Sequence, residues 1–156
     1  MENDECPSAG LLIWPEELSV GNSVLDDDHK AFIDLANLIM EWRDDGVIAS
    51  AVSMLEEYVQ GHFFREEKAM RAVGYRRLAE HQLKHERFKA RIKAITQMYQ
   101  DGMKSAVEGL PKLVLDWFAD HVLKDDLQYK NWINDGVVDG RPLAFLALEA
   151  DAKQSS

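Results

Sequence analysis

Residues 78–99 read LAEHQLKHERFKARIKAITQMY, and this stretch decides the fold class. Its apolar and histidine positions are separated by three and four residues in regular alternation. Because one helical turn takes about 3.6 residues, this spacing places all of them on one stripe of an α-helix. The stripe consists of Leu78, His81, His85, Phe88, Ile92, Ile95 and Tyr99. It predicts a helix that packs in a bundle and carries two histidines on its inward face.

Three other segments have the same period, and short breaks separate the four. The inward positions are His29, Ile33, Ala36 and Met40 in about 26–43, Leu55, Val59, His62, Glu66 and Met70 in about 50–71, and Leu110, Val114, Trp117 and His121 in about 108–133. The breaks are DDGV (44–47), AVGY (72–75), QDG (100–102) and NDG (134–136). Their Gly and Asp residues favour turns. Four amphipathic helices with short connections predict an all-α, up-down-up-down four-helix bundle.

The length of 156 residues fits a single domain. The expected parts are an N-terminal arm (1–22), the four-helix bundle (23–133) and a short C-terminal extension (134–156). The extension contains PLAFLALEA (142–150), which either forms a short helix docked on the bundle or binds a partner.

The composition limits the partners and the compartment. Lys and Arg number 18 and Asp and Glu 28, a formal net charge of −10, which argues against binding to DNA, RNA or anionic membranes. No apolar run approaches the roughly 20 residues of a membrane span, and the start MENDECPSAG lacks a secretory signal. Cys6 is the single cysteine, so no internal disulfide and no CxxC zinc knuckle can form. We expect a cytoplasmic protein.

All five histidines of the chain fall on the predicted inward faces. His81 and His85 are four residues apart and therefore stand one above the other on a helix, and His62 and Glu66 share this spacing. A single inward histidine is ordinarily a hydrogen-bonded core residue, but five from four helices cannot all find such partners. A buried Glu66 also needs a cation or strong donors to offset its desolvation. The pattern predicts a metal site, and imidazole suits iron, zinc, copper or nickel.

A ligand count favours two metal ions with unequal sites. Suppose that one iron binds His81, His85 and His121, and that the other binds His29 and His62. If Glu66, one Asp and a hydroxide bridge both ions, the first iron reaches octahedral coordination and the second is one ligand short. The open position on the second iron is where a small ligand would bind.

The second bridging carboxylate would come from HVLKDDLQY (121–129), which offers two adjacent aspartates. Asp125 lies four residues after His121, and Asp126 lies five residues after it. Helix geometry alone favours Asp125, because a residue five positions on lies about 140° away around the helix.

The order and spacing of these residues resemble the hemerythrin family. The matching motifs are Asp26-x-x-His29, His62-x-x-x-Glu66, His81-x-x-x-His85 and His121-x-x-x-x-Asp126. Trp14, LSVG (18–21) and His29-Lys30 are similar to the arm and first helix of its bacterial members, the bacteriohemerythrins. The resemblance covers about residues 14–133. The metal ligands that it implies are His29, His62, Glu66, His81, His85, His121 and Asp126.

The resemblance selects Asp126 over Asp125 as the bridging carboxylate. A bridging ligand must reach between two metals rather than lie above His121, and a local π-type widening of the helix near 121–126 would bring Asp126 into line. Asp125 would then face solvent. Glu67, beside the implied ligand Glu66, would have an exposed capping or salt-bridging role.

The family implies reversible O2 binding at two non-haem iron ions, bridged by an oxo or hydroxo group and two carboxylates. The protein would then serve oxygen transport, delivery or storage and would have no catalytic residues. A protein partner that receives the oxygen is compatible with this role. Two carboxylates donate less negative charge than the carboxylate-rich ferritin-like sites, which disfavours oxygenase chemistry. Five side chains resemble the family's apolar wall around O2, although each would also suit an ordinary core: Phe32, Phe63, Trp117, Phe118 and Val122.

Other functions remain open from the sequence. The same site could serve an oxygen or redox sensor that signals through the C-terminal tail, or a di-iron redox enzyme that handles peroxide or nitric oxide. A metal-free histidine phosphotransfer bundle would need an exposed histidine. A zinc hydrolase fits poorly, because zinc sites are usually four-coordinate.

Overall fold

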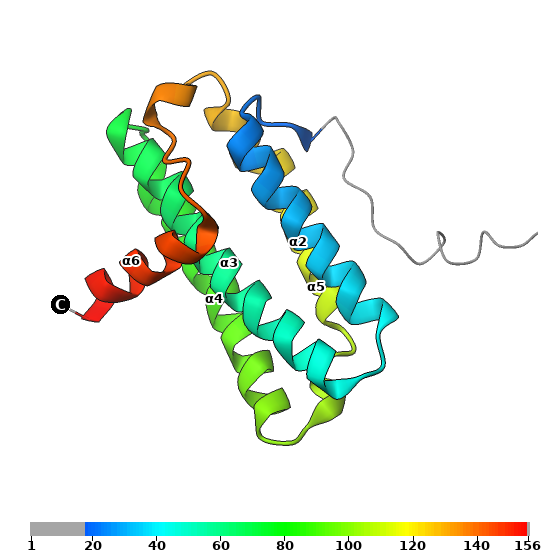
Figure 1. The fold of residues 1–156 in the computed structure, drawn as a ribbon. Helices are drawn as coiled ribbons and strands as arrows, with labels where there is room; N and C mark the ends of the chain where they lie inside the picture. The colour runs from blue at the N-terminus through cyan, green and yellow to red at the C-terminus, as the bar shows by residue number, and fades with distance from the viewer. Residues whose placement is uncertain (1–17, 156) are drawn as a thin grey trace, which may run out of the picture.

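The computed structural model describes residues 18–155, which form five α-helices and three short 3₁₀ helices. The α-helices are α2 (Ser23–Glu41), α3 (Asp45–Ala72), α4 (Leu78–Gln100), α5 (Leu110–Lys124) and α6 (Leu143–Ser155). The 3₁₀ helices are η2 (Lys104–Val107), η3 (Asp126–Tyr129) and η4 (Asp135–Val137). Helices α2 to α5 run alternately in opposite directions and form a four-helix bundle (Figure 1), which confirms the predicted fold class. Cys6, Trp14 and most of the expected N-terminal arm lie outside the described residues.

Side-chain caps set where the first two helices of the bundle begin. The Asn22 side chain accepts a hydrogen bond from the Leu25 N–H at 3.0 Å, and Asp44 accepts from the N–H groups of Gly46 and Val47 at 2.8 and 3.1 Å. Such caps satisfy the first free N–H groups of a helix. The helices therefore begin several residues before the apolar stripes that predicted them, at Ser23 and Asp45.

The end of the fourth helix differs from the prediction of about 108–133. Helix α5 ends at Lys124, where the Asp125 N–H still donates to the His121 carbonyl at 2.7 Å. The next turn tightens, because the Gln128 N–H donates to the Asp125 carbonyl, only three residues back, at 3.2 Å. The expected π-type widening is therefore wrong. The chain changes direction by tightening into η3, directly after the C-cap Asp125.

Two apolar clusters fill the bundle, and a buried polar layer separates them. One cluster includes Phe32, Leu55, Phe63, Phe88 and Phe118, and the other includes Leu25, Met70, Val122 and Tyr129. On α2, His29 lies between Leu25 of one cluster and Phe32 of the other. On α5, His121 likewise lies between Phe118 of one cluster and Val122 of the other, and the remaining histidines are also buried. A polar layer enclosed by apolar clusters is shielded from solvent, so each of its charges needs a partner within the protein.

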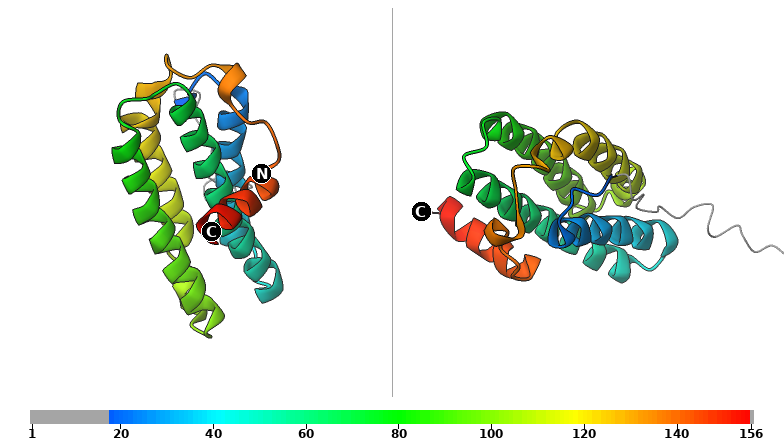
Figure 2. Two further views of the ribbon diagram at one scale, coloured as in Figure 1. Left: turned by 90° about the vertical axis from the view of Figure 1, so that its left-hand side faces the viewer. Right: turned by 90° about the horizontal axis from the view of Figure 1, so that it is seen from above.

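The C-terminal extension docks on the outside of the bundle, as one of its two interpretations predicted. Helix α6 lies across α3 (Figure 1; Figure 2). Its inner residues are Leu143, Leu146, Ala147 and Ala150, all buried, whereas Phe145 and Leu148 are exposed. The described part of the chain has no helix that is both long and apolar enough to cross a membrane.

Candidate metal centre

The seven residues that the sequence suggested as ligands meet in the polar layer, and each is buried. Helix α2 provides His29, α3 provides His62 and Glu66, α4 provides His81 and His85, α5 provides His121, and η3 provides Asp126. The potential ligand atoms of six of them form two groups that share Glu66, and Asp126 lies beside His81, His121 and His29. The three-histidine group contains His81, His85 and His121, and the two-histidine group contains His29 and His62. This grouping is the same as that of the two-iron ligand count.

The ring nitrogens within each group face one another. In the three-histidine group, the Nε2 atom of His121 lies 3.0 Å from that of His81 and 3.2 Å from that of His85. In the two-histidine group, the Nε2 atoms of His29 and His62 are 3.1 Å apart. All five rings therefore direct the same type of atom, Nε2, into the layer.

The two buried carboxylates each reach from one group to the other. Glu66 places Oε1 2.9 Å from His81 Nε2 and 3.0 Å from His85 Nε2, and its Oε2 lies 3.7 Å from His62 Nε2. Asp126 likewise places Oδ1 3.0 Å from His81 Nε2, while its Oδ2 lies 3.6 Å from His29 Nε2. Each carboxylate thus has one oxygen on each side, which is the arrangement that a bridging ligand requires.

Asp126 reaches this position because α5 stops one turn after His121. The turn into η3 points the Asp126 side chain inward, where Oδ1 also lies 3.1 Å from His121 Nε2. Both Asp126 oxygens are completely buried, and neither accepts a well-aligned hydrogen bond from a described residue. A buried carboxylate without such donors is costly, so Asp126 fits a position beside a cation.

Three of the rings have a carboxylate at the opposite nitrogen, Nδ1. His62 Nδ1 lies 2.8 Å from Asp28 Oδ2, His85 Nδ1 lies 2.6 Å from Glu67 Oε2, and His121 Nδ1 lies 3.1 Å from Asp125 Oδ2. Carboxylates in this position fix the ring orientation and keep the proton on Nδ1. Two predictions are corrected here. Asp125 holds His121 rather than facing solvent, and Glu67 holds His85 from a largely buried position rather than capping a helix at the surface.

This proton arrangement explains why a metal ion fits the layer. When Nδ1 donates to a carboxylate, the neutral ring has a lone pair on Nε2. The Nε2 lone pairs of His85 and His121 would then face each other at 3.2 Å and repel. A shared proton can relieve one such pair, but His121 Nε2 also faces His81 Nε2 at 3.0 Å. A metal ion can accept several lone pairs at once, and the nitrogen and oxygen donors here suit a transition-metal cation.

The ionisable side chains of the layer shift one another's pKa values. Burial favours the neutral form of His81, but Glu66 and Asp126 outweigh it and raise the pKa of His81 to about 10. Burial opposes ionisation of Glu66, yet the facing histidines, His81 above all, hold the pKa of Glu66 well below its usual value. Burial and the neighbouring His62 lower the pKa of His29 to about 4. The layer therefore keeps ionised carboxylates inside the protein, as a cation site must.

Two residues beside the layer, Tyr129 and Arg65, were not predicted from the sequence. The Tyr129 hydroxyl donates to Glu66 Oε2 at 2.6 Å, and burial raises the pKa of Tyr129 well above its usual value. Arg65 is also buried and bonds to both oxygens of Asp28 at 2.5 Å. Tyr129 thus helps to fix the orientation of Glu66, the carboxylate shared by the two groups. Arg65 does the same for Asp28, the partner of His62.

The five residues of the expected apolar wall occupy three different positions. Phe32 and Phe118 lie against the two-histidine group, with ring centroids 5.3 Å from His62 and 5.8 Å from His29, respectively. Phe63 stacks on His85 at 3.7 Å, and Trp117 stacks on His121 at 4.3 Å. Val122 belongs to the other apolar cluster, together with Met70 and Tyr129.

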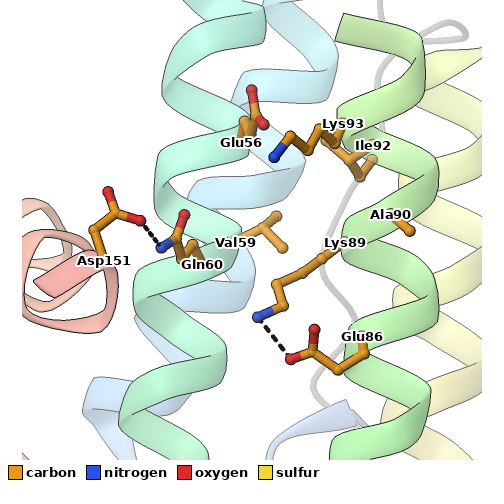
Figure 3. A pocket seen from close by; sticks show the side chains of 9 residues that line it. All are labelled: Glu56, Val59, Gln60, Glu86, Lys89, Ala90, Ile92, Lys93 and Asp151. Atoms are coloured by element: carbon orange, nitrogen blue, oxygen red, sulfur yellow. Dashed lines mark hydrogen bonds and ion pairs between the residues drawn. The ribbon is translucent and has the colours of Figure 1, made fainter. Parts of the chain in front are cut away.

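A separate surface pocket of about 290 Å³ lies between α3, α4 and α6 (Figure 3). Its lining residues are Glu56, Val59, Gln60, Glu86, Lys89, Ala90, Ile92, Lys93 and Asp151, none of which belongs to the polar layer. Two pairs of its polar side chains are bonded, Lys89 to Glu86 at 2.8 Å and Gln60 to Asp151 at 2.5 Å. The chemistry of the molecule therefore centres on the buried layer.

The fold and the layer define an all-helical bundle with a buried cation site made of histidine and carboxylate. Residues 20–133 match the family described as Hemerythrin HHE cation binding domain. The chain therefore belongs to the hemerythrin family. The matched residues contain the whole polar layer, and the extension from residue 134 onward lies beyond them.

Similar proteins are consistent with this assignment. A bacteriohemerythrin of Pseudomonas paraeruginosa (strain DSM 24068 / PA7) is 29% identical over 121 residues, which cover 76% of this chain and 78% of that protein. A bacteriohemerythrin of Clostridium acetobutylicum is 28% identical over 128 residues, 76% of this chain and 98% of that protein. A crystal structure of wild-type hemerythrin superposes with a TM-score of 0.71 at 23% identity, covering 79% of this chain and 98% of the other, which supports the fold.

Proposed function

We propose that the protein binds O2 reversibly at a non-haem di-iron centre and serves oxygen transport, delivery or storage. One observation carries the proposal: the Nε2 atoms of five buried histidines and the oxygens of two buried carboxylates converge in one layer, in groups of three and two rings. Membership of the hemerythrin family supports it. The proposed ligands are His29, His62, Glu66, His81, His85, His121 and Asp126.

In this proposal each histidine group holds one iron, and the two carboxylates bridge the irons together with an oxo or hydroxo group. Glu66 and Asp126 support bridging, since each has one oxygen toward each group. Imidazole and carboxylate suit iron, whereas zinc usually occupies four-coordinate sites. Two ferrous ions, when bound, supply the electrons through which O2 is held and then released.

The inequality of the two groups indicates where O2 would bind. With shared carboxylates, His29 and His62 would supply one histidine fewer to their iron than the other group does, which would leave room for O2 on that side. The neighbouring side chains Phe32 and Phe118 are apolar and fully buried, and their rings stack at a centroid distance of 4.6 Å. They exclude water and offer no proton donor. Such a wall favours release of O2 unchanged over its reduction.

The donor set also favours binding over catalysis. Two carboxylates leave the site less negative than the carboxylate-rich di-iron sites of ferritin-like proteins. Lower negative charge stabilises highly oxidised iron poorly, so the protein is proposed to be a carrier rather than an enzyme. Sustained turnover of peroxide or nitric oxide with an electron donor would favour the enzymatic alternative. Release of the extension upon O2 binding would favour a sensor.

The test is the visible spectrum of the iron-loaded protein, recorded without oxygen, in air and after purging with argon. We expect two irons per chain and a charge-transfer band that appears in air and fades on purging. Protein loaded with zinc is the control and should show no band. A band that persists after purging, or no band despite two bound irons, would contradict reversible O2 binding.

A further inference from the structure

The C-terminal extension meets the polar layer through one buried side chain, Arg65. Arg65 Nη1 donates to both oxygens of Asp28 at 2.5 Å, and Asp28 in turn lies 2.8 Å from His62 Nδ1. On its other side, Arg65 Nε donates to the carbonyl of Asp139 at 2.7 Å, and Nη2 donates to the carbonyl of Arg141. The extension, Arg65, Asp28 and His62 therefore form one continuous hydrogen-bonded chain.

We propose that Arg65 is a positioning residue for the two-histidine side of the centre, and that the extension holds Arg65 in place through the backbone carbonyls of Asp139 and Arg141. The extension would thereby tune the side of the site at which O2 binding is proposed. Only this last consequence rests on the proposed function. The positioning of His62 does not depend on which metal the layer holds.

Burial makes Arg65 sensitive to all of these partners. A guanidinium with 3% exposure must have partners for its charge and its N–H groups. Asp28 neutralises the charge, and the two carbonyls occupy donors that Asp28 does not use. Because the guanidinium is planar and rigid, fixing one edge with the carbonyls also fixes the edge that binds Asp28.

The other histidine supports do not use the extension. Glu67, the partner of His85, accepts a hydrogen bond from Gln82 of α4 at 3.1 Å. Asp125, the partner of His121, is bonded to Lys84 of α4 at 2.5 Å. These supports lie inside the residues that match the family, whereas the two carbonyls lie beyond residue 133. The extension therefore acts selectively on His62.

Several contacts hold the extension in register with α3. Lys68 of α3 pairs with Asp139 at 3.0 Å, and Gln60 of α3 donates to Asp151 of α6 at 2.5 Å. The close approach of α6 also requires Gly61. A Cβ atom at Gly61 would lie 2.5 Å from the Leu143 carbonyl oxygen, a distance that forces the backbone of the extension to move.

Gly61→Ala therefore displaces the extension without changing any atom of Arg65, Asp28 or His62. Gly109→Ala is the matched control, because a Cβ there meets nothing within 4 Å. Alanine favours a helix over glycine, so Gly61→Ala would stabilise α3 if the extension were irrelevant. Arg65→Lys is the second variant, since it retains the charge but cannot bind Asp28 and the two carbonyls together.

The first measurement is the NMR spectrum of ¹⁵N-labelled histidine rings in the iron-free protein. We expect the His62 Nδ1–H signal to shift and exchange faster in Gly61→Ala and Arg65→Lys, while the His85 signals stay unchanged. Gly109→Ala should match the wild type. If α6 only stabilised the fold, Gly61→Ala would lower the stability of the protein without a selective change in the His62 signals. His62 signals like those of the wild type in Arg65→Lys would overturn the proposal.

The second measurement is iron release to a chelator from the fully loaded variants. One of the two irons should be bound about 10–100-fold more weakly in Gly61→Ala and Arg65→Lys, the usual effect of losing support for a ligand. Equal weakening of both irons would contradict selective action on His62. A wild type that binds no iron would instead refute the proposed function, and the NMR result would still decide whether the extension positions His62.

Discussion

Replacing Asp126 with Asn is expected to leave the protein with less than one iron per chain. Its two oxygens face opposite histidine groups, at 3.0 Å from His81 Nε2 and 3.6 Å from His29 Nε2. An amide keeps the shape but loses the charge and replaces one oxygen with an NH2 group. Both proposed irons would therefore lose a ligand. Iron content after anaerobic loading and desalting is the measurement.

Asp125→Asn is the matched control because it changes the adjacent carboxylate. Asp125 lies near His121 Nδ1, so it supports a ligand instead of reaching between the groups. We expect this variant to bind two irons with about 10–100-fold weaker affinity, as is typical for a residue that supports a ligand. If Asp125→Asn lost its iron while Asp126→Asn retained both, the assignment of the bridging carboxylate would be wrong.

Removing iron should lower the thermal stability of the protein strongly. Without a metal, the layer confines two ionised carboxylates and several facing Nε2 atoms in a buried space. A ligand present at a thousand times its dissociation constant stabilises the folded state by about 4 kcal/mol. For a chain of this size that corresponds to a Tm difference of about 8–16 °C.

Calorimetry of iron-loaded and chelator-treated protein measures this difference. Asp126→Asn provides the comparison, because a variant that no longer binds iron should show nearly the same Tm with and without added iron. Equal Tm values for loaded and iron-free wild type would mean that iron does not bind the folded layer in preference to the unfolded chain. That result would contradict a buried centre.

The ring positions could be predicted from sequence because helical spacing alone defines them. Intervals of three and four residues placed His81 and His85 on one inward face, and the same rule placed His29, His62 and His121. The partition into three and two rings was a supposition of the ligand count and did not follow from the spacing, and the structure groups the rings in the same way. The four helices of the bundle were predictable for the same reason.

The details that were wrong or missed depend on contacts between distant segments. The sequence does not show that α5 stops at Lys124, so Asp126 was assigned to a widened helix rather than to the tighter η3 turn. The partnership of Asp125 with His121 depends on that same ending. Arg65 was missed because two of its partners are backbone carbonyls, which leave no signature in the residue types.

The most direct test of the two-iron centre is anomalous diffraction at the iron absorption edge from crystals of the iron-loaded protein. We expect two peaks about 3.5 Å apart. One peak should lie among His81, His85 and His121 and the other beside His29 and His62, with Glu66 and Asp126 touching both. A single peak, or iron found only outside the polar layer, would show that the layer does not hold a two-iron centre.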